Sequence, residues 1–488
     1  MATTLAQKQT KLFFKWLDKT EVKNAILSSC LFLGAAFCIG VNGLSLTNHL
    51  TRSYAIDPVE ASLVVEASRI AQGTNDLGAA TAVTTHAYGW LSPHFLAVFA
   101  RVMPLTNQTG RYISFACALA TIVLLCTVFA SGQRWTFQLF AFATLLSIQG
   151  NGEYFAQNRP DMIALLLCVL FVMGFYQGLQ RENLTMKLGA TVLLLIATAF
   201  KQTATAWALI PALAVLFDSK GKMSKDWLFA LLPVFFVTAY FACMKFIAPD
   251  TFATAMTDMT EMTLPLKAIA QTLWATAQAN PLLTALLLAS AVAGKPRASF
   301  APWMHATLLV LFFACCTSMA KHTGQFNNLL PLHFAVAAYC IDSLKHYFKR
   351  PVAKLGVPIA LMVLWLVQCF PNGPVLNRYY LLNDARQTAY TETVNYVSGL
   401  PGTVVSPEDP TIALFGHGNA DRNFFMEFDA RGGWVALPGD LTAYVSNANY
   451  AVEAVGGYAT DILRAGHFQT MGFTLDRDFG DYVVWKKR

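Results

Sequence analysis

The chain has 488 residues, of which 55% are hydrophobic and only 13% are charged. Soluble domains have about 25% charged residues, so this composition excludes an ordinary soluble globular protein. Apolar runs of membrane-spanning length recur from about residue 24 to about residue 372, which predicts a polytopic, mainly α-helical membrane protein. The net charge of +7 does not indicate nucleic-acid binding, because the basic excess lies at the N-terminus and in short loops, where membrane orientation explains it.

The apolar runs predict about eleven transmembrane helices within residues 24–371, after a basic cytoplasmic N-terminus at residues 1–23. Lysines and arginines gather in alternate loops between these runs, and the positive-inside rule places such loops in the cytoplasm. The loop at 249–279 then lies outside. The predicted spans are residues 24–46, 111–131, 135–150, 161–178, 186–200, 203–217, 226–248, 280–294, 301–320, 330–344 and 355–371.

The first predicted outer loop, residues 47–110, differs from a plain connection between helices. Its central stretch, Ser53–Arg101, carries four acids, two arginines and two histidines. Connections between packed helices usually have only a few residues, and a long charged loop often carries function. We therefore expect the functional site to form around this loop.

Two short helices are expected inside this loop. Pro58–Ala71 has amphipathic spacing and follows Asp57, a residue type that is favoured at the N-cap position. Tyr88–Met103 is apolar but short, so we expect it to lie along the membrane surface instead of crossing the bilayer. Within it, His94 and Arg101 are seven residues apart and share one helix face.

Other predicted outer loops carry acids and cations that a plain loop does not need. Taken singly, such a residue is usually a helix cap or a snorkelling cation. Their grouping on one predicted face favours a functional site, because charges at membrane depth are costly. The residues are Glu153, Arg159 and Asp161 in the second outer loop, Lys201 and Gln202 at a tight turn within an apolar stretch, and Lys321 and His322 further along.

The last part of the chain, residues 372–488, is polar and predicts a small α/β domain on the outer face. Short β-like runs occur at Thr403–Ser406 and Tyr482–Trp485. They alternate with helix-like segments at Ala385–Ser398 and Ala459–Met471.

The polar residues suggest transfer chemistry on a phosphate-bearing lipid at the outer surface. A lipid phosphate needs cations, and a hydroxyl or amine acceptor needs a base such as the Asp57 carboxylate. Phosphate leaves readily once its charge is compensated, so the protein supplies mainly positioning and electrostatics. The candidate cations are Arg101, Arg159, Lys201 and Lys321, with His94, Gln202 and His322 as further substrate-binding candidates.

In the order and spacing of several motifs, the chain resembles the GT-C superfamily of membrane glycosyltransferases. The resemblance is to the bacterial branch related to protein O-mannosyltransferases and to aminoarabinose transferases that act on lipid A, and it covers most of residues 24–350. The motifs are Asp57-Pro-Val-Glu60, Tyr88-Gly-Trp-Leu-Ser-Pro93, Gly110-Arg111-Tyr-Ile-Ser, Asn158-Arg159-Pro160-Asp161 and Phe200-Lys201-Gln202-Thr203.

The resemblance implies a sugar transferase that uses a polyprenyl-phosphate donor and a lipid, glycan or protein acceptor at the periplasmic face of the bacterial inner membrane. An acid of the first outer loop acts in the family as base or as ligand of a divalent metal, and Asp57 matches it. A second acid often comes from the second outer loop, where Glu153 or Asp161 could serve. The chain lacks the usual adjacent acidic pair, since Asp57 and Glu60 are three residues apart, so both stay catalytic candidates.

Two other functions compete with this interpretation. A transporter or flippase of a lipid-linked saccharide would usually have helices broken near mid-membrane, with polar residues at that depth. Here the polar interruptions lie mainly at the predicted outer ends of the helices. A non-catalytic membrane protein would not need the grouped acids and cations, so the enzyme is the preferred prediction.

Overall fold

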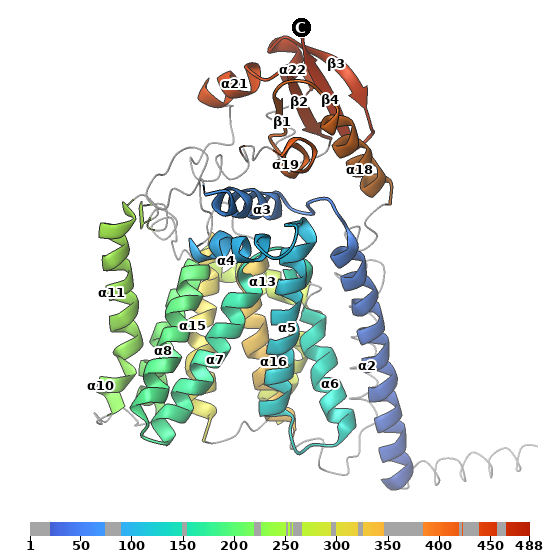
Figure 1. Cartoon of the computed structure of the whole chain (residues 1–488). Helices are drawn as coiled ribbons and strands as arrows, with labels where there is room; N and C mark the ends of the chain where they lie inside the picture. The colour runs from blue at the N-terminus through green and yellow to red at the C-terminus, as the bar shows by residue number, and fades with distance from the viewer. Residues whose placement is uncertain are drawn as a thin grey trace, which may run out of the picture.

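The computed structural model describes the chain outside residues 1–19, 74–88, 149–153, 219–225, 250–251, 254–255, 257–265, 294–298, 321–325, 346–383, 419–421, 423–438 and 456–464. A bundle of upright helices forms the lower part, two helices lie across its upper end, and a sheet with its own helices lies above them (Figure 1). The upright helices are α2 (Thr20–Thr51), α5 (Asn107–Phe129), α6 (Trp135–Leu146), α7 (Asp161–Gln180), α8 (Leu184–Phe200), α9 (Ile210–Asp218), α10 (Asp226–Ala230), α11 (Leu232–Ile247), α14 (Pro281–Ala293), α15 (Ala301–Ala320) and α16 (Leu330–Leu344).

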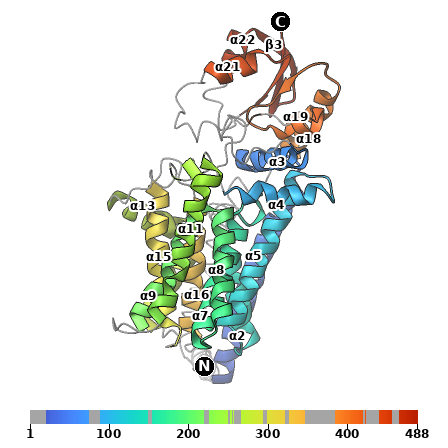
Figure 2. The ribbon, with the colours of Figure 1, turned by 60° about the vertical axis from the view of Figure 1, so that its left-hand side comes forward.

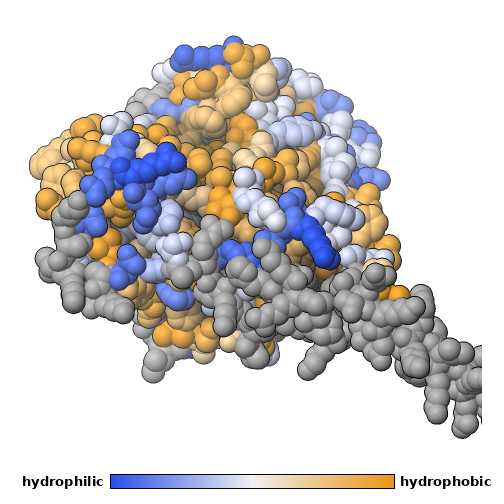
Figure 3. Space-filling model, turned by 90° about the horizontal axis from the view of Figure 1, so that it is seen from below, coloured by the Kyte–Doolittle hydropathy of each residue, from blue (hydrophilic) through white to orange (hydrophobic). Residues whose placement is uncertain are grey.

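Within the described residues, five helical stretches are long and apolar enough to cross a membrane, and further apolar helices are shorter. The chain is therefore a multi-pass membrane protein. Helices occupy all the predicted spans that the structure describes; the predicted span at 355–371 lies outside the described residues. Eleven spans thus stay a prediction. Seen from below, hydrophilic patches interrupt an apolar surface at the lower end of the bundle (Figure 3).

The bounds of the first outer loop, 47–110, stay a prediction; in the structure, the segment between the end of α2 and the start of α5 runs from residue 52 to residue 106. Helix α2 continues past its apolar part to Thr51, whose hydroxyl donates a hydrogen bond to a carbonyl one turn earlier. Helix α5 begins early because Thr106 and Thr109 form a reciprocal capping box, which satisfies free amides at the helix start.

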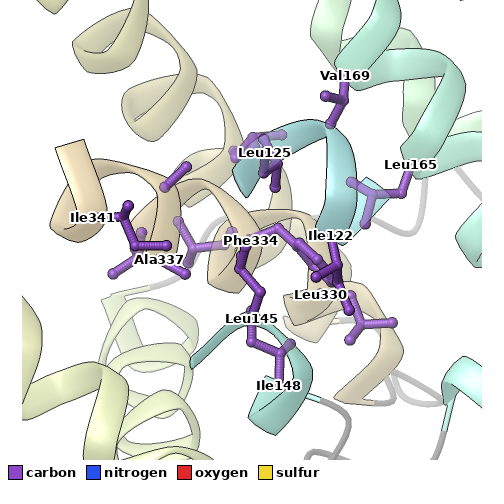
Figure 4. Close-up of a cluster of buried hydrophobic side chains, with 14 of the residues drawn as sticks. Ile122, Leu125, Leu145, Ile148, Leu165, Val169, Leu330, Phe334, Ala337 and Ile341 are labelled. Atoms are coloured by element: carbon purple, nitrogen blue, oxygen red, sulfur yellow. The ribbon is translucent and has the colours of Figure 1, made fainter. Parts of the chain in front are cut away.

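The core of the bundle is apolar and closely packed around α16. Phe334 of α16 is wholly buried and lies among side chains of α5, α6 and α7, including Ile122, Leu145 and Leu165 (Figure 4). These helices have apolar residues on several faces, as expected for helices that pack in a bundle and also face lipid. The rigid bundle sets the positions of the helix ends at which polar residues gather.

The two helices across the upper end are α3 (Pro58–Ala71) and α4 (Leu91–Ala100), which pack on each other through Leu63 and Leu96. Helix α3 confirms the prediction, with Asp57 as its N-cap. The backbone of Asp57 is extended (φ −136°), and its Oδ1 accepts a hydrogen bond from the Val59 amide at 2.8 Å. The proline at the first helical position fixes this entry into the helix.

A close backbone contact ties the start of α4 to the end of α8. The Gly89 amide donates to the Phe200 carbonyl at 3.1 Å, and the Ser92 hydroxyl donates to the same oxygen at 3.1 Å. A Cβ at Gly89 would lie 1.9 Å from the Ala199 carbonyl oxygen, so only glycine allows this approach. The contact fixes the chain next to Lys201, which follows Phe200 directly.

The C-terminal part forms a four-stranded sheet in the order β1-β2-β4-β3. Strand β1 pairs in parallel with β2, and β4 is antiparallel to both of its neighbours. We call this sheet and its helices the C-terminal unit; its predicted start at residue 372 lies outside the described residues. Its elements are α18 (Asp384–Ser398), β1 (Val404–Val405), α19 (Thr411–His417), α21 (Gly439–Ser446), β2 (Tyr450–Ala454), α22 (Ala465–Thr470), β3 (Phe473–Asp478) and β4 (Tyr482–Lys487).

The strands predicted around residues 404 and 483 and the helix predicted at 385–398 are confirmed. The helix predicted at 459–471 is described from residue 465 onward. Helix α19 lies above α3 in both ribbon views, and α18 lies beside α19 (Figure 2). Leu414 of α19 packs against Leu63 and Val64 of α3, so the C-terminal unit contacts the first loop directly.

Candidate active site

Three buried ion pairs form at the upper end of the bundle, around the start of α3. Each joins a carboxylate to a cation that is distant in sequence. None of the six side chains is more than 10% exposed. Charges at this depth are costly unless they are paired and hydrogen-bonded, and they commonly mark a function. The pairs are Glu60 with Arg111, Asp57 with Arg159, and Asp161 with Lys201.

The Glu60–Arg111 pair is fully enclosed and fully hydrogen-bonded. Arg111 donates to both carboxylate oxygens of Glu60, at 2.9 and 2.7 Å. Its remaining donors reach the carbonyls of His49, Arg52 and Tyr54 at 2.7–3.0 Å. All five N–H groups of the guanidinium therefore have partners.

Glu60 has no capacity left for a substrate. Besides the two bonds from Arg111, its oxygens accept the amides of Ile56 at 2.8 Å and Asn158 at 2.6 Å. Both Glu60 and Arg111 are wholly buried. The sequence left Glu60 open as a catalytic acid; these contacts give it the geometry of a structural anchor that joins α3, α5 and the loop before α7.

Asp57 has a different environment. While its Oδ1 caps α3, its Oδ2 accepts a hydrogen bond from Nη2 of Arg159 at 2.5 Å, and its side chain is 10% exposed. The Arg159 guanidinium also lies over the ring of Tyr154, with 5.3 Å between its carbon and the ring centroid. The carboxylate is thus held in place, but by fewer bonds than that of Glu60.

Tyr154 lies in the short helical turn Tyr154–Ala156, and the charges of Asp57 and Asp161 act on its hydroxyl. Burial raises the pKa of its hydroxyl, Arg159 lowers it, and the charges of Asp57 and Asp161 raise it. The hydroxyl therefore stays protonated at neutral pH.

Asp161 is the first residue of α7, and its Oδ1 accepts hydrogen bonds from the Lys201 ammonium and from the Asn327 amide, the latter at 3.0 Å. Lys201 has an extended backbone and joins α8 to the short helix Gln202–Leu209, which confirms the predicted tight turn between two helices. The Asp161 Oδ2 is buried and has no hydrogen-bond partner among the residues that the structure describes. A buried acceptor of this kind points to a ligand or solvent partner.

A cavity of about 40 Å³ adjoins this pair, with Asp161, Lys201 and Asn327 among its lining residues. A second cavity, of about 50 Å³, is almost wholly apolar and extends along α5, α7, α15 and α16. Leu165, Trp207 and Pro331 line both cavities, so the two cavities adjoin each other. This arrangement suits an amphipathic ligand with an anionic head and an apolar chain.

The described residues do not fit a divalent metal ion. Within that part of the chain, no group of three His, Cys, Asp or Glu side chains comes together in a way that could hold one. Asp57 and Asp161 are each already compensated by a cation, Arg159 and Lys201.

The structure brings together only part of the predicted set. Asp57, Glu60, Arg159, Asp161 and Lys201 gather at the upper end of the bundle. Three other predicted residues lie apart from this group: Gln202 is half-buried and lines neither cavity, His94 bonds to the Trp90 carbonyl at the start of α4, and Arg101 is exposed at the end of α4. The predicted residues Glu153, Lys321 and His322 lie outside the described residues.

Sequence reasoning did not place Arg111, Tyr154 or Asn327 in the site. Arg111 carried a signal, because a single arginine in the first turn of an apolar helix needs a partner at membrane depth. Gly110 beside it is explained by packing, since a Cβ there would lie 1.8 Å from Oδ1 of Asn158. Tyr154 and Asn327 carried no signal of comparable strength.

The helical bundle, the crossing helices and the C-terminal sheet define a multi-pass membrane protein with the GT-C fold, as solved structures show. ArnT from Cupriavidus metallidurans, solved with bound undecaprenyl phosphate, is similar over 93% of this chain and 97% of its own, with a TM-score of 0.53 and 12% identity. The oligosaccharyltransferase AglB from Archaeoglobus fulgidus, solved with an inhibitory peptide and a dolichol-phosphate, is similar over 87% of this chain and 69% of its own, with a TM-score of 0.50 and 11% identity.

Both proteins are GT-C glycosyltransferases, so the fold that the sequence resemblance implied is confirmed. No protein-family model matches the chain, and a search of curated proteins finds no match. At these identities, the likeness concerns the fold. The function must be argued from the site.

Proposed function

We propose that this protein is a glycosyltransferase that moves a sugar from a polyprenyl-phosphate-linked donor to an acceptor at the periplasmic face of the bacterial inner membrane. The observation that carries the proposal is the buried Asp161–Lys201 pair, which lines a cavity that adjoins an apolar one, together with the buried Asp57–Arg159 pair, whose arginine lies two residues before Asp161. The shared fold with two transferases, solved with lipid phosphates bound, supports it.

In this proposal, the polar cavity receives the donor phosphate. Lys201 and Arg159 supply the positive charge, and the Asn327 amide supplies a further donor. The apolar cavity receives the first isoprene units of the lipid, whose chain needs no polar partner. Both cavities are small, so side chains around them must move to admit the donor.

Transfer would follow a direct displacement with inversion. The acceptor hydroxyl or amine attacks the anomeric carbon, and its proton passes to the Asp57 carboxylate. The bond between that carbon and the phosphate oxygen breaks, and polyprenyl phosphate leaves with the electron pair. Lys201 and Arg159 compensate the charge that develops on the phosphate, which is the largest electrostatic demand of the reaction.

The ion pairs imply an order of events. Asp57 is engaged by Arg159 before the donor arrives, at 2.5 Å. The phosphodiester of the donor carries one negative charge, like a carboxylate, and it can compete for the guanidinium through bidentate hydrogen bonds. Donor binding would then loosen the Asp57–Arg159 pair and free Asp57 to accept the proton.

A transporter or flippase of a lipid-linked saccharide is less well supported. Such proteins commonly place polar groups and broken helices near mid-membrane. Here the buried acids sit at the first residue of α7 and before the first turn of α3, at one end of the bundle. The cavity that extends further along the bundle is almost wholly apolar.

Deletion of the gene tests the function. The donor should accumulate, because transfer is the step that consumes it, and mass spectrometry of extracted lipids should show a polyprenyl-phosphate sugar that the parent strain lacks. The wild-type gene should remove this lipid. If no polyprenyl-linked sugar accumulates, or if it accumulates only on the cytoplasmic side, the glycosyltransferase proposal fails and the transporter gains support.

Replacement of Lys201 by Met should weaken binding of undecaprenyl phosphate by about 10- to 100-fold, since a hydrogen bond to a charged group contributes about 1.5–3 kcal/mol. Binding is measured on purified protein in nanodiscs. Lys187→Met is the matched control, because Lys187 is also buried but lies over the Phe229 ring near the other end of α8.

A second variant separates binding from folding. Lys201→Met leaves Asp161 buried without its cation, whereas Lys201→Met combined with Asp161→Asn keeps the site neutral. Wild-type affinity for undecaprenyl phosphate in both variants would show that Lys201 does not bind the lipid phosphate.

A further inference from the structure

The chain that leads from α2 to Asp57 is held by the membrane bundle and α3. Side chains of α3 and α5 form hydrogen bonds with backbone groups of residues 52–56, so this segment is held in place although it is not helical. The contacts join Arg111 to the carbonyls of Arg52 and Tyr54, Asn107 to that of Ser53, and Glu60 to the amide of Ile56, all at 2.7–2.9 Å.

The C-terminal unit holds the same segment from the opposite side. Oε1 of Gln387, on α18, accepts the amide of Ser53 at 2.8 Å. The amide of Ala55 faces the carboxyl of Asp409, just before α19, and lowers its pKa. The amides of Ser53 and Ala55 thus face side chains of the C-terminal unit that lie more than three hundred positions later in the chain.

The side chain between these two amides is enclosed by the C-terminal unit. Tyr54 is wholly buried, and its ring lies 6.4 Å from that of Tyr390. The Arg386 guanidinium lies over the same ring, with 5.0 Å from its carbon to the centroid. Tyr54 therefore belongs to the hydrophobic core of the C-terminal unit, although it comes from the first loop.

The carboxyl of Asp409 is buried in the C-terminal unit, and its burial lowers the stability of the folded protein. It is 5% exposed, and its Oδ1 accepts both the amide and the hydroxyl of Thr411. Burial raises the pKa of its carboxyl. A buried acid is retained at a cost in stability, and the Ala55 amide of the first loop is among the groups that lower the pKa of this carboxyl.

We infer that the C-terminal unit is a positioning element for the candidate catalytic loop, in which Asp409 and Gln387 fix residues 53–56 and thereby the carboxylate of Asp57. Neither residue touches the substrate. The catalytic consequence rests on the proposed function, whereas the mechanical coupling between the C-terminal unit and the loop does not.

Hydrogen exchange of the full-length protein in nanodiscs tests the coupling without any substrate. In Asp409→Leu and in Gln387→Ala, the backbone amides of residues 53–60 should exchange about tenfold faster than in the wild type, since Gln387→Ala removes the hydrogen bond to Ser53 and Asp409→Leu removes the carboxyl that the Ala55 amide faces. Tyr396→Phe is the matched control. Tyr396 also lies on α18, but its hydroxyl bonds to Asp476 at 2.6 Å instead of to the loop, so residues 53–60 should stay protected.

Unchanged exchange of residues 53–60 in both variants would overturn the inference. Should Asp409→Leu unfold the C-terminal unit, seen as lost protection in β2 and β4, Gln387→Ala alone decides, because Gln387 is half-buried on α18 and outside the core of the unit.

A kinetic measurement tests the positioning role. With the lipid-linked sugar that accumulates in the deletion strain as donor, Gln387→Ala should lower kcat by about tenfold and leave the affinity for undecaprenyl phosphate unchanged. A change in affinity with unchanged kcat would contradict a role through Asp57. If no transfer occurs even in the wild type, the proposed function fails. The hydrogen-exchange experiment still tests the coupling between the C-terminal unit and the loop, because it needs no substrate.

Discussion

Replacement of Asp57 by Asn is expected to lower sugar transfer by about 10²–10⁴-fold, the usual contribution of a general base. The variant should stay folded, because Asn is as good an N-cap as Asp and can still accept the Val59 amide. Turnover is measured with the accumulated lipid-linked donor, and folding is followed by thermal unfolding in nanodiscs.

The affinity for the lipid phosphate distinguishes a role of Asp57 in proton transfer from a role in helix capping or in donor binding. Because Asp57 competes with the donor for Arg159 in the proposed order of events, Asp57→Asn should bind undecaprenyl phosphate as tightly as the wild type or more tightly. Full activity in this variant would reduce Asp57 to a helix cap and ion-pair partner. Weakened binding together with lost turnover would assign it to donor binding instead of proton transfer.

Replacement of Glu60 by Gln should destabilise the protein by about 3–5 kcal/mol, because breaking a buried ion pair leaves an uncompensated charge. Arg111 would keep its three backbone carbonyls but lose its only carboxylate partner among the described residues. Arg111→Met should have an effect of similar size. Thermal unfolding and the yield of folded protein in membranes measure both.

A surface ion pair near the same loop provides the control. Arg52 pairs with Asp384 at 2.6 Å, but the Asp384 side chain is 93% exposed. Asp384→Asn should therefore change stability by no more than about 1 kcal/mol. A Glu60→Gln protein with wild-type stability and no activity would return Glu60 to the role of catalytic acid.

Several features of this protein follow from local sequence alone. Hydrophobic runs predict the helices because burial in lipid depends on composition over about 20 residues. The start of α3 at Pro58 was predictable from the cap residue and the proline, and the break at Lys201 from a charge within an apolar stretch. These signals lie within one or two helical turns, where the chain's own geometry relates the residues.

The pairing of the acids depended on the tertiary structure. Asp57 and Glu60 are equivalent candidates in the sequence, three residues apart. In the fold, Glu60 meets Arg111 across 51 positions and is enclosed, whereas Asp57 meets Arg159 across 102 positions and keeps some exposure. No periodic pattern relates residues at such separations, because their contact depends on how helices pack.

The contact between the first loop and the C-terminal unit also depended on the tertiary structure. The sequence predicted a C-terminal α/β region but not that its core would include Tyr54 or that Gln387 would bond to Ser53, 334 positions earlier. The composition of the sequence thus determined the membrane class, and short-range signals placed the first loop. The burial of individual charges, and therefore the division between structural and catalytic acids, was decided by packing, because the cost of a charge depends on its surroundings in the folded protein.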